Sequence, residues 1–108
     1  MALHHVAPGE TFHLGTVNDP NANTAALVKN DGFEVAQLLL RKGDVIAAHA
    51  VPGYATIHCI EGCVTLDVAG QVKLSAGDWI YLDRGERHSV LAHEDSSLLV
   101  TILFDRQI

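Results

Sequence analysis

Residues 43–62 read GDVIAAHAVPGYATIHCIEG and residues 77–88 read GDWIYLDRGERH, and these two stretches decide the fold. Each begins with Gly-Asp; the first holds two more glycines and two histidines, and the second holds one more glycine and one histidine. Glycine at such places is typical of tight turns, whereas histidine is a common metal ligand and proton carrier. We call the six positions the glycine–histidine frame: Gly43, His49 and Gly62, then Gly77, Gly85 and His88.

The residues around the frame alternate between apolar and polar with a period of two. Val64, Leu66 and Val68 lie on one face of a predicted strand, and Ala69-Gly70 then makes a tight turn, so residues 63–75 read as a β-hairpin. Further strands are predicted at Phe33 to Leu40, Val45 to Val51, Ala55 to Ile60, Trp79 to Leu82, His88 to His93 and Leu98 to Phe104.

The pattern contains no convincing helix. Residues 18–23 form a polar loop, and Ala25 to Lys29 fits either a short helix or a strand. Eight or so short strands at close spacing favour an all-β fold, either an antiparallel barrel or a two-sheet jelly roll, because both arrangements bury most strand edges.

Composition limits the domain count and the partners. With 108 residues, 48% of them hydrophobic, the chain can build one core, so we expect a single domain with N-terminal strands and loop in 1–32 and the barrel core in 33–104. A formal charge of −6 without a basic run disfavours nucleic acid and anionic membrane as partners. No targeting or membrane-spanning segment is evident, which predicts a cytoplasmic protein. Cys59 and Cys63 are expected to be reduced packing residues.

The frame resembles the two motifs of the cupin family of small β-barrels. The first family motif runs Gly, five residues, His-x-His, three or four residues, Glu, six residues, Gly. In this chain Gly43, His49 and Gly62 match that motif, while Val51 stands at the second His and Ala55 at the Glu.

The second family motif runs Gly, five residues, Pro-x-Gly, two residues, His, three residues, Asn. Here Gly77, Gly85 and His88 match, whereas Asp83 replaces the Pro and Ala92 replaces the Asn. The resemblance implies a cupin-type antiparallel β-barrel, that is, a double-stranded β-helix or jelly roll, of the small bacterial single-domain kind. Because most members of that subgroup have no assigned activity, it implies a fold and a pocket and not a reaction.

The resemblance also implies a metal site, from which this chain has lost ligands. Metal-using cupins offer three His and one Glu, and here only His49 and His88 remain, because Val51 and Ala55 carry no lone pair to donate. Counting by twos along the predicted strands puts His58 and His93 on the outer face. We therefore expect either no cofactor or a weakly bound divalent metal.

Without a strong metal site, the two histidines have two further interpretations. They are either buried imidazoles that simply fit the barrel, or a polar pair that orients a small molecule in an apolar pocket. We favour the pocket interpretation and keep a metal-dependent isomerase or dioxygenase, using iron, manganese, nickel or zinc, as the alternative. The predicted pocket residues are His49, Val51, Tyr54, Ala55, Ile57, His88 and Ala92.

Three surface features complete the expectations. Arg84 and Arg87 fit either capture of an anionic group or a solvated turn in which Asp83 and Glu86 neutralise them, and the second is favoured. Trp79 and Tyr81 share one face of their strand, which lies against the cavity or a partner. Two outward-facing regions are more apolar than a lone small barrel needs: the stripe Thr56, His58 and Ile60, and the last strand, Leu98 to Phe104. They predict a homodimer, which the resemblance also implies.

Overall fold

The computed structural model describes residues 5–20 and 22–105, and these residues form nine β-strands. They include no helix that could cross a membrane. In chain order the strands are β1 (Ala25–Lys29), β2 (Phe33–Leu40), β3 (Val45–His49), β4 (Gly53–Glu61), β5 (Cys63–Asp67), β6 (Gln71–Ser75), β7 (Trp79–Leu82), β8 (His88–Ala92) and β9 (Ser96–Phe104).

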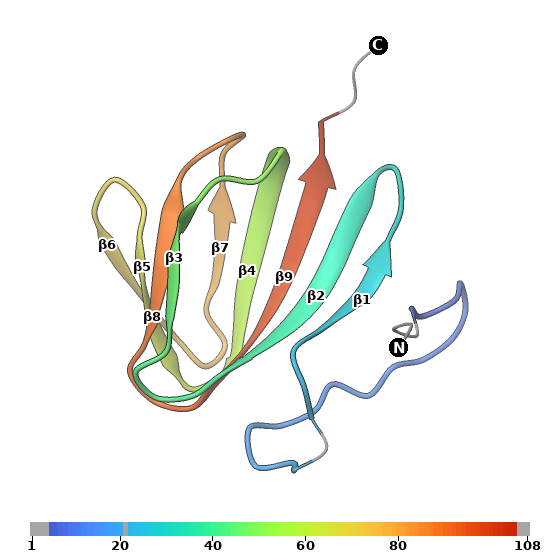
Figure 1. Ribbon diagram of the computed structural model, residues 1–108, viewed down its shortest axis with the longest axis horizontal. Helices are drawn as coiled ribbons and strands as arrows, with labels where there is room; N and C mark the ends of the chain where they lie inside the picture. The colour runs from blue at the N-terminus through green and yellow to red at the C-terminus, as the bar shows by residue number, and fades with distance from the viewer. Residues whose placement is uncertain (1–4, 21, 106–108) are drawn as a thin grey trace.

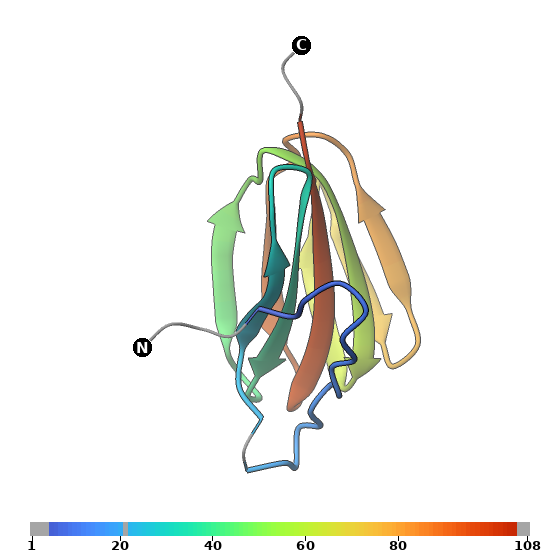
Figure 2. The same ribbon diagram turned by 90° about the vertical axis from the view of Figure 1, so that its right-hand side faces the viewer.

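The strands form two antiparallel sheets that face each other (Figure 1). The five-stranded sheet has the order β1-β2-β9-β4-β7, and the four-stranded sheet has the order β3-β8-β5-β6. Most neighbours in each sheet are distant in sequence, and Figure 2 shows the two layers from the side. This all-β jelly roll is the fold class that the period-two pattern predicted.

Alternation along β4 builds much of the core. Ala55, Ile57 and Cys59 are buried at 2%, 2% and 0% exposure, whereas the residues between them are partly exposed. The inward and outward faces predicted for this strand are therefore confirmed. The inward face packs against the opposite sheet, where Val64 and Leu66 are both fully buried.

Most strand predictions were right to within two residues. The strand at 33–40, the hairpin at 63–75 and the strand at 79–82 have the predicted bounds. The ambiguous segment Ala25–Lys29 is a strand, because it pairs with β2. β3 ends at His49, two residues before its predicted end, where the register with β8 shifts between Ile46 and His49 and the chain approaches Pro52.

The four glycines of the frame all have positive φ angles, between 68° and 94°. Most residues avoid this region, so glycine suits these turns. Gly62 has a second reason, because a β-carbon there would collide with the backbone of Ser96 and the carbonyl of Asp95. The chain therefore needs glycine at the β4–β5 turn for both conformation and space.

The segment before β1 runs along the outside of the five-stranded sheet without forming a strand in its described part (Figure 2). One attachment is Gln37, buried on the outer face of β2, whose Nε2 donates to the Gly15 carbonyl at 2.7 Å and to Ser97 Oγ at 3.0 Å. The Glu61 carboxylate also accepts a hydrogen bond from the Val17 amide. Residues 1–4 of the predicted N-terminal region lie outside the described part.

β9 lies in the middle of the five-stranded sheet, between β2 and β4. Leu98 on its inner face is fully buried, whereas Leu103 on its outer face is 46% exposed. The central position explains part of the apolar content of this strand without a second subunit. The homodimer stays a prediction.

Candidate functional site

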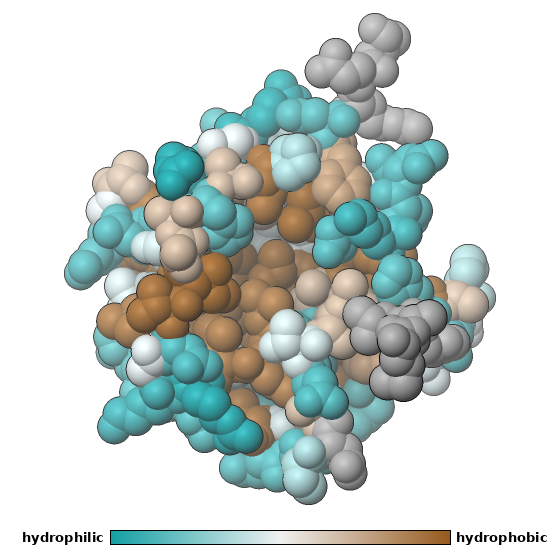
Figure 3. Space-filling view, viewed as in Figure 1, coloured by the Kyte–Doolittle hydropathy of each residue, from teal (hydrophilic) through white to brown (hydrophobic). Residues whose placement is uncertain are grey.

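A cavity of about 300 Å³ lies between the two sheets at the end of the barrel that holds His49 and His88. Figure 3 shows a hollow with hydrophobic residues exposed near the centre of that view. The lining comes from β2, β3, β4, β8, β9 and the loop after β3, and all but three of its residues are aliphatic: Glu34, Ala36, Leu38, Ile46, His49, Val51, Ala55, Ile57, His88, Val90, Leu98, Val100 and Ile102.

The structure brings five of the seven predicted pocket residues together around this cavity: His49, Val51, Ala55, Ile57 and His88. Whether they contact a ligand stays a prediction.

The other two predicted pocket residues do not line the cavity. Tyr54 lies on the outer face of β4, because it alternates with the buried Ala55, and its ring stacks on that of Tyr81 with centroids 5.9 Å apart. Ala92 is buried but pairs with Val64, four residues along β8 from the histidine at its start. That separation is about 13 Å along a strand, too far for it to widen the cavity.

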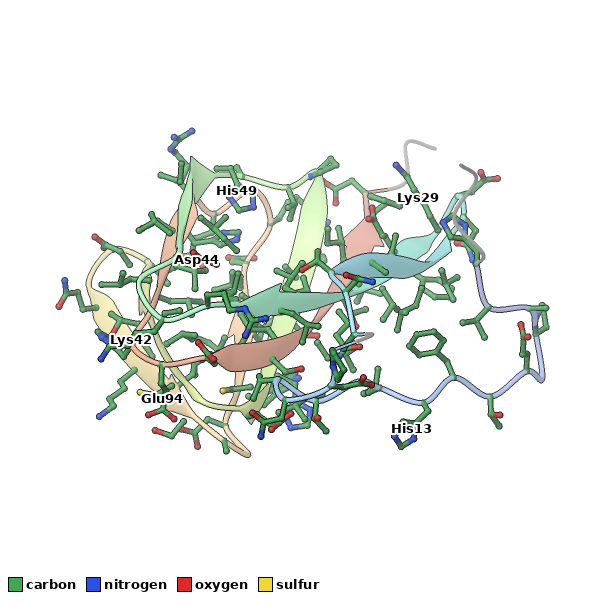
Figure 4. All side chains as sticks on the ribbon, turned by 60° about the horizontal axis from the view of Figure 1, so that its bottom comes forward. His13, Lys29, Lys42, Asp44, His49 and Glu94 are labelled. Carbon is green, nitrogen blue, oxygen red and sulfur yellow. The ribbon has the colours of Figure 1, made fainter. Side chains whose placement is uncertain are left out.

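The two histidines of the frame are direct neighbours across β3 and β8. His49 pairs with His88 in the register, and their ring centroids are 4.4 Å apart with the planes tilted by 55°. His88 is only 6% exposed, whereas His49 is exposed at the end of β3, where the chain turns toward β4 (Figure 4). The cavity therefore opens to solvent beside His49, with His88 deeper inside.

Backbone carbonyls fix which ring nitrogen carries the proton. His49 Nδ1 lies 3.0 Å from the Ala47 carbonyl oxygen, and His88 Nδ1 lies 3.2 Å from that of Glu86. A carbonyl oxygen only accepts, so each Nδ1 must donate, and in a neutral ring Nε2 then carries a lone pair. Within residues 5–20 and 22–105, neither Nε2 has a hydrogen-bond partner.

Burial keeps the inner ring neutral. Loss of solvent lowers the pKa of His88, the hydrogen bond to the Glu86 carbonyl opposes this, and the neighbouring His49 ring lowers the pKa further. At neutral pH His88 is therefore an uncharged acceptor facing an apolar space.

Glu34 is a cavity residue that the sequence reasoning did not identify. It lies on the same face of β2 as Ala36 and Leu38, and all three line the cavity. Alternation along residues 33–40 groups these residues on one face, which was a usable signal. It did not reveal that this face is the inner one, because the opposite face carries the apolar Val35 and Leu39.

Few side chains at the cavity could act as metal ligands. His49 and His88 could supply two imidazole ligands, but the part of the chain that the structure describes holds no cluster of three or more His, Cys, Asp or Glu with suitable geometry. Cys59, a soft donor of the correct parity, is fully buried away from the cavity, and burial raises its pKa to about 11. The expectation of no cofactor or a weakly bound divalent metal stays a prediction.

Both arginines of the loop before β8 contact groups outside that loop. The Arg84 Nε pairs with the Asp105 carboxylate at 2.6 Å, and its guanidinium lies over the Tyr54 ring. Arg87 donates to the Ala48 carbonyl. Asp83 and Glu86 accept hydrogen bonds from backbone amides of the same loop. Their neutralisation of the arginines through the overall charge of the loop stays a prediction.

The structure also decides the orientation of the aromatic residues of β7. Trp79 and Tyr81 are 59% and 52% exposed, on the outer face of an edge strand. They therefore do not line the cavity.

Comparison with known proteins agrees with this architecture. The family model described as "Cupin domain" matches residues 36–104, which is more than half of the chain. The chain belongs to the cupin family. In this cupin the match begins within β2 and ends with β9, so it includes both histidines of the frame. No protein with a curated description matches the sequence.

Solved structures share the fold of this cupin at low sequence identity. A conserved protein of unknown function from Streptococcus pyogenes has a TM-score of 0.78 and 18% identity, covering 99% of this chain and 100% of its own. A cupin superfamily protein from Desulfitobacterium hafniense has a TM-score of 0.79 and 13% identity, covering 97% and 100%. KdgF from Halomonas has a TM-score of 0.68 and 18% identity, covering 78% and 79%. These similarities define the fold alone.

Proposed function

We propose that this cupin binds a small, mostly apolar molecule in its barrel. The molecule is oriented by a hydrogen bond that it donates to His49 or His88. The observation that carries the proposal is the pair of Nδ1–carbonyl hydrogen bonds, which leave both Nε2 lone pairs for another partner. A hydroxyl or N–H group of the ligand supplies such a donor. A few polar groups in an apolar cavity are typical of small-molecule sites.

The size of the cavity limits the ligand. A dry cavity of about 150 Å³ already admits benzene. The present cavity of about 300 Å³ therefore has room for a substituted single ring or a short branched chain. Large sugars or nucleotides exceed this volume.

A matched pair of simple compounds tests the role of the histidines. Phenol offers a ring and a hydroxyl donor, and anisole offers the same ring without the donor. We expect phenol to bind about tenfold more tightly, the difference typical of one hydrogen bond to an otherwise unpaired acceptor. Binding is followed as chemical-shift changes of the β3 and β8 amides in an NMR titration.

A histidine outside the cavity provides the control for this titration. His49→Leu should remove the preference for phenol, whereas His93→Leu should keep it, because His93 is exposed and bonds to Thr65 on the outer face. Equal binding of phenol and anisole by the wild type would contradict the role of the histidines. Absence of any shift at the cavity with either compound would contradict the proposed function itself.

The same geometry favours a second candidate, a metal-dependent isomerase or dioxygenase. Histidines that bind metals usually donate their other ring nitrogen to a carbonyl or carboxylate, as His49 and His88 do here. A bound divalent ion would act as a Lewis acid and leave most of its coordination positions to water and substrate. These two residues would hold it through their Nε2 atoms.

Elemental analysis separates the two candidates. The protein is purified without a nickel column and compared with the His49→Ala, His88→Ala double variant. Near-stoichiometric iron, manganese, nickel or zinc in the wild type, absent from the variant, would favour the enzyme. A wild type that takes up no added metal would contradict it.

A further inference from the structure

Glu34 is the only charged residue among the described residues that line the cavity. It is half-buried on β2, beside Ala36 on the same face, and its register partners are Ile102 of β9 and the exposed Lys29 of β1, which does not line the cavity. Across residues 5–20 and 22–105, no hydrogen bond or ion pair engages its carboxylate. A carboxylate beside apolar side chains is costly unless a cation accompanies it.

The register places this carboxylate on the wall opposite the histidines. Glu34 pairs with Ile102 of β9, and Ile102 pairs with Ala55 of β4, so the three form one row across the five-stranded sheet. Two strand spacings put Glu34 about 10 Å from Ala55. His49 and His88 belong to the other sheet. A ligand between the two sheets therefore meets polar groups at two separate places.

All three polar side chains of the lining offer acceptors to this space. The Glu34 carboxylate only accepts, and both histidine Nε2 atoms carry lone pairs, while the other lining side chains are aliphatic. Arg84 pairs with Asp105 and Arg87 donates to the Ala48 carbonyl, both outside the cavity. Lys29, opposite Glu34 in β1, is exposed and is not part of the lining. An anionic ligand would therefore find acceptors where it needs donors.

We propose that the ligand is a small apolar amine whose ammonium group pairs with Glu34 while its apolar body fills the cavity. This inference rests on the proposed function and specifies its ligand class. A second donor on the ligand, such as a hydroxyl, would reach the histidine pair. Carboxylates and phosphates of the same size are excluded by like charge and by the lack of donors.

Three compounds of nearly equal shape test the charge: 2-phenylethylamine, 2-phenylethanol and phenylacetate. By isothermal titration calorimetry we expect the amine to bind the wild type about tenfold more tightly than the alcohol, as one charge-assisted hydrogen bond predicts. Phenylacetate should bind less tightly than the alcohol. The comparison within the wild type does not depend on the folding of any variant.

Two variants with the same change in net charge locate the effect. Glu34→Gln keeps the shape of the side chain and should abolish the preference for the amine over the alcohol. Asp67→Asn, at the exposed end of β5, should preserve that preference, because it lies outside the cavity. Loss of the preference in both variants would point to overall charge and would overturn the assignment to Glu34.

The failures of the two proposals are distinguishable. If the alcohol binds and the amine binds no more tightly, the amine assignment is wrong while the proposed function stands. If none of the three compounds binds and phenol also causes no shift at the cavity, both proposals are wrong.

Discussion

The two ends of the barrel are built from the same strands and differ in how they are filled. At one end Val64 and Leu66 are fully buried and pack with Cys59, all three away from the cavity. At the other end, β4 presents Ala55 and β8 presents His88 to the cavity. Buried aliphatic side chains fill the space between the sheets at the first end, whereas the lining residues leave a cavity at the second.

The largest expected effect follows from removing a large side chain at the closed end. Leu66→Ala should reduce the free energy of unfolding by about 2–5 kcal/mol, because it leaves a void in a packed core. Leu91→Ala, on the neighbouring strand but 40% exposed, is the control and should cost less than about 1 kcal/mol. Urea denaturation measures both. Similar losses for the two variants would contradict the contrast between core and surface.

Adding side-chain volume should distinguish the two ends. Ala92→Leu overfills the closed end and should destabilise the fold by about 1–3 kcal/mol. Ala36→Leu adds the same volume beside the cavity and should change stability by less than about 1 kcal/mol, because space is available. The second variant should also weaken phenol binding. Equal destabilisation of both variants would show that the open end is packed in solution.

Acid should destabilise the open end through His88. Burial lowers the pKa of this residue, so between the unfolded-state pKa of about 6.5 and the lower folded value the unfolded chain binds more protons. Stability contributed by the neutral ring is thus present above pH 6.5 and is lost as the pH falls through that window. Thermal unfolding of wild type, His88→Gln and the surface control His93→Gln between pH 7.5 and 5 tests this.

The expected result is a smaller loss of stability on acidification in His88→Gln than in the other two proteins. Phenol binding should weaken over the same range, because protonation removes the acceptor lone pair. Parallel pH profiles for all three proteins would show that His88 does not determine this dependence.

The smallest expected effect concerns the outer surface. Asp105→Asn breaks the pair with Arg84, whose side chain is 59% exposed, and should cost about 0–1 kcal/mol. Affinity for phenol should not change, because neither residue lines the cavity. A change in affinity, measured by the same NMR titration, would mean that the outer loop contributes to the site.

Much of the open end could be predicted because motif spacing fixes positions along strands. His49 and His88 were identified as a pair, and the register does place them opposite each other. Tyr54 and Ala92 were misplaced for different reasons. Tyr54 has the wrong parity for the inner face, whereas Ala92 has an inward side chain at the wrong depth.

By itself, the sequence determined the strands, their turns and the inward face of β4, because alternation and glycine conformation are local properties of the chain. Only the tertiary structure decided which face of β2 and β7 points inward, and how far each side chain lies from the cavity. Glu34 facing the cavity and Trp79 facing outward follow from pairing with strands distant in sequence. A period of two defines two faces but cannot say which one the opposite sheet covers.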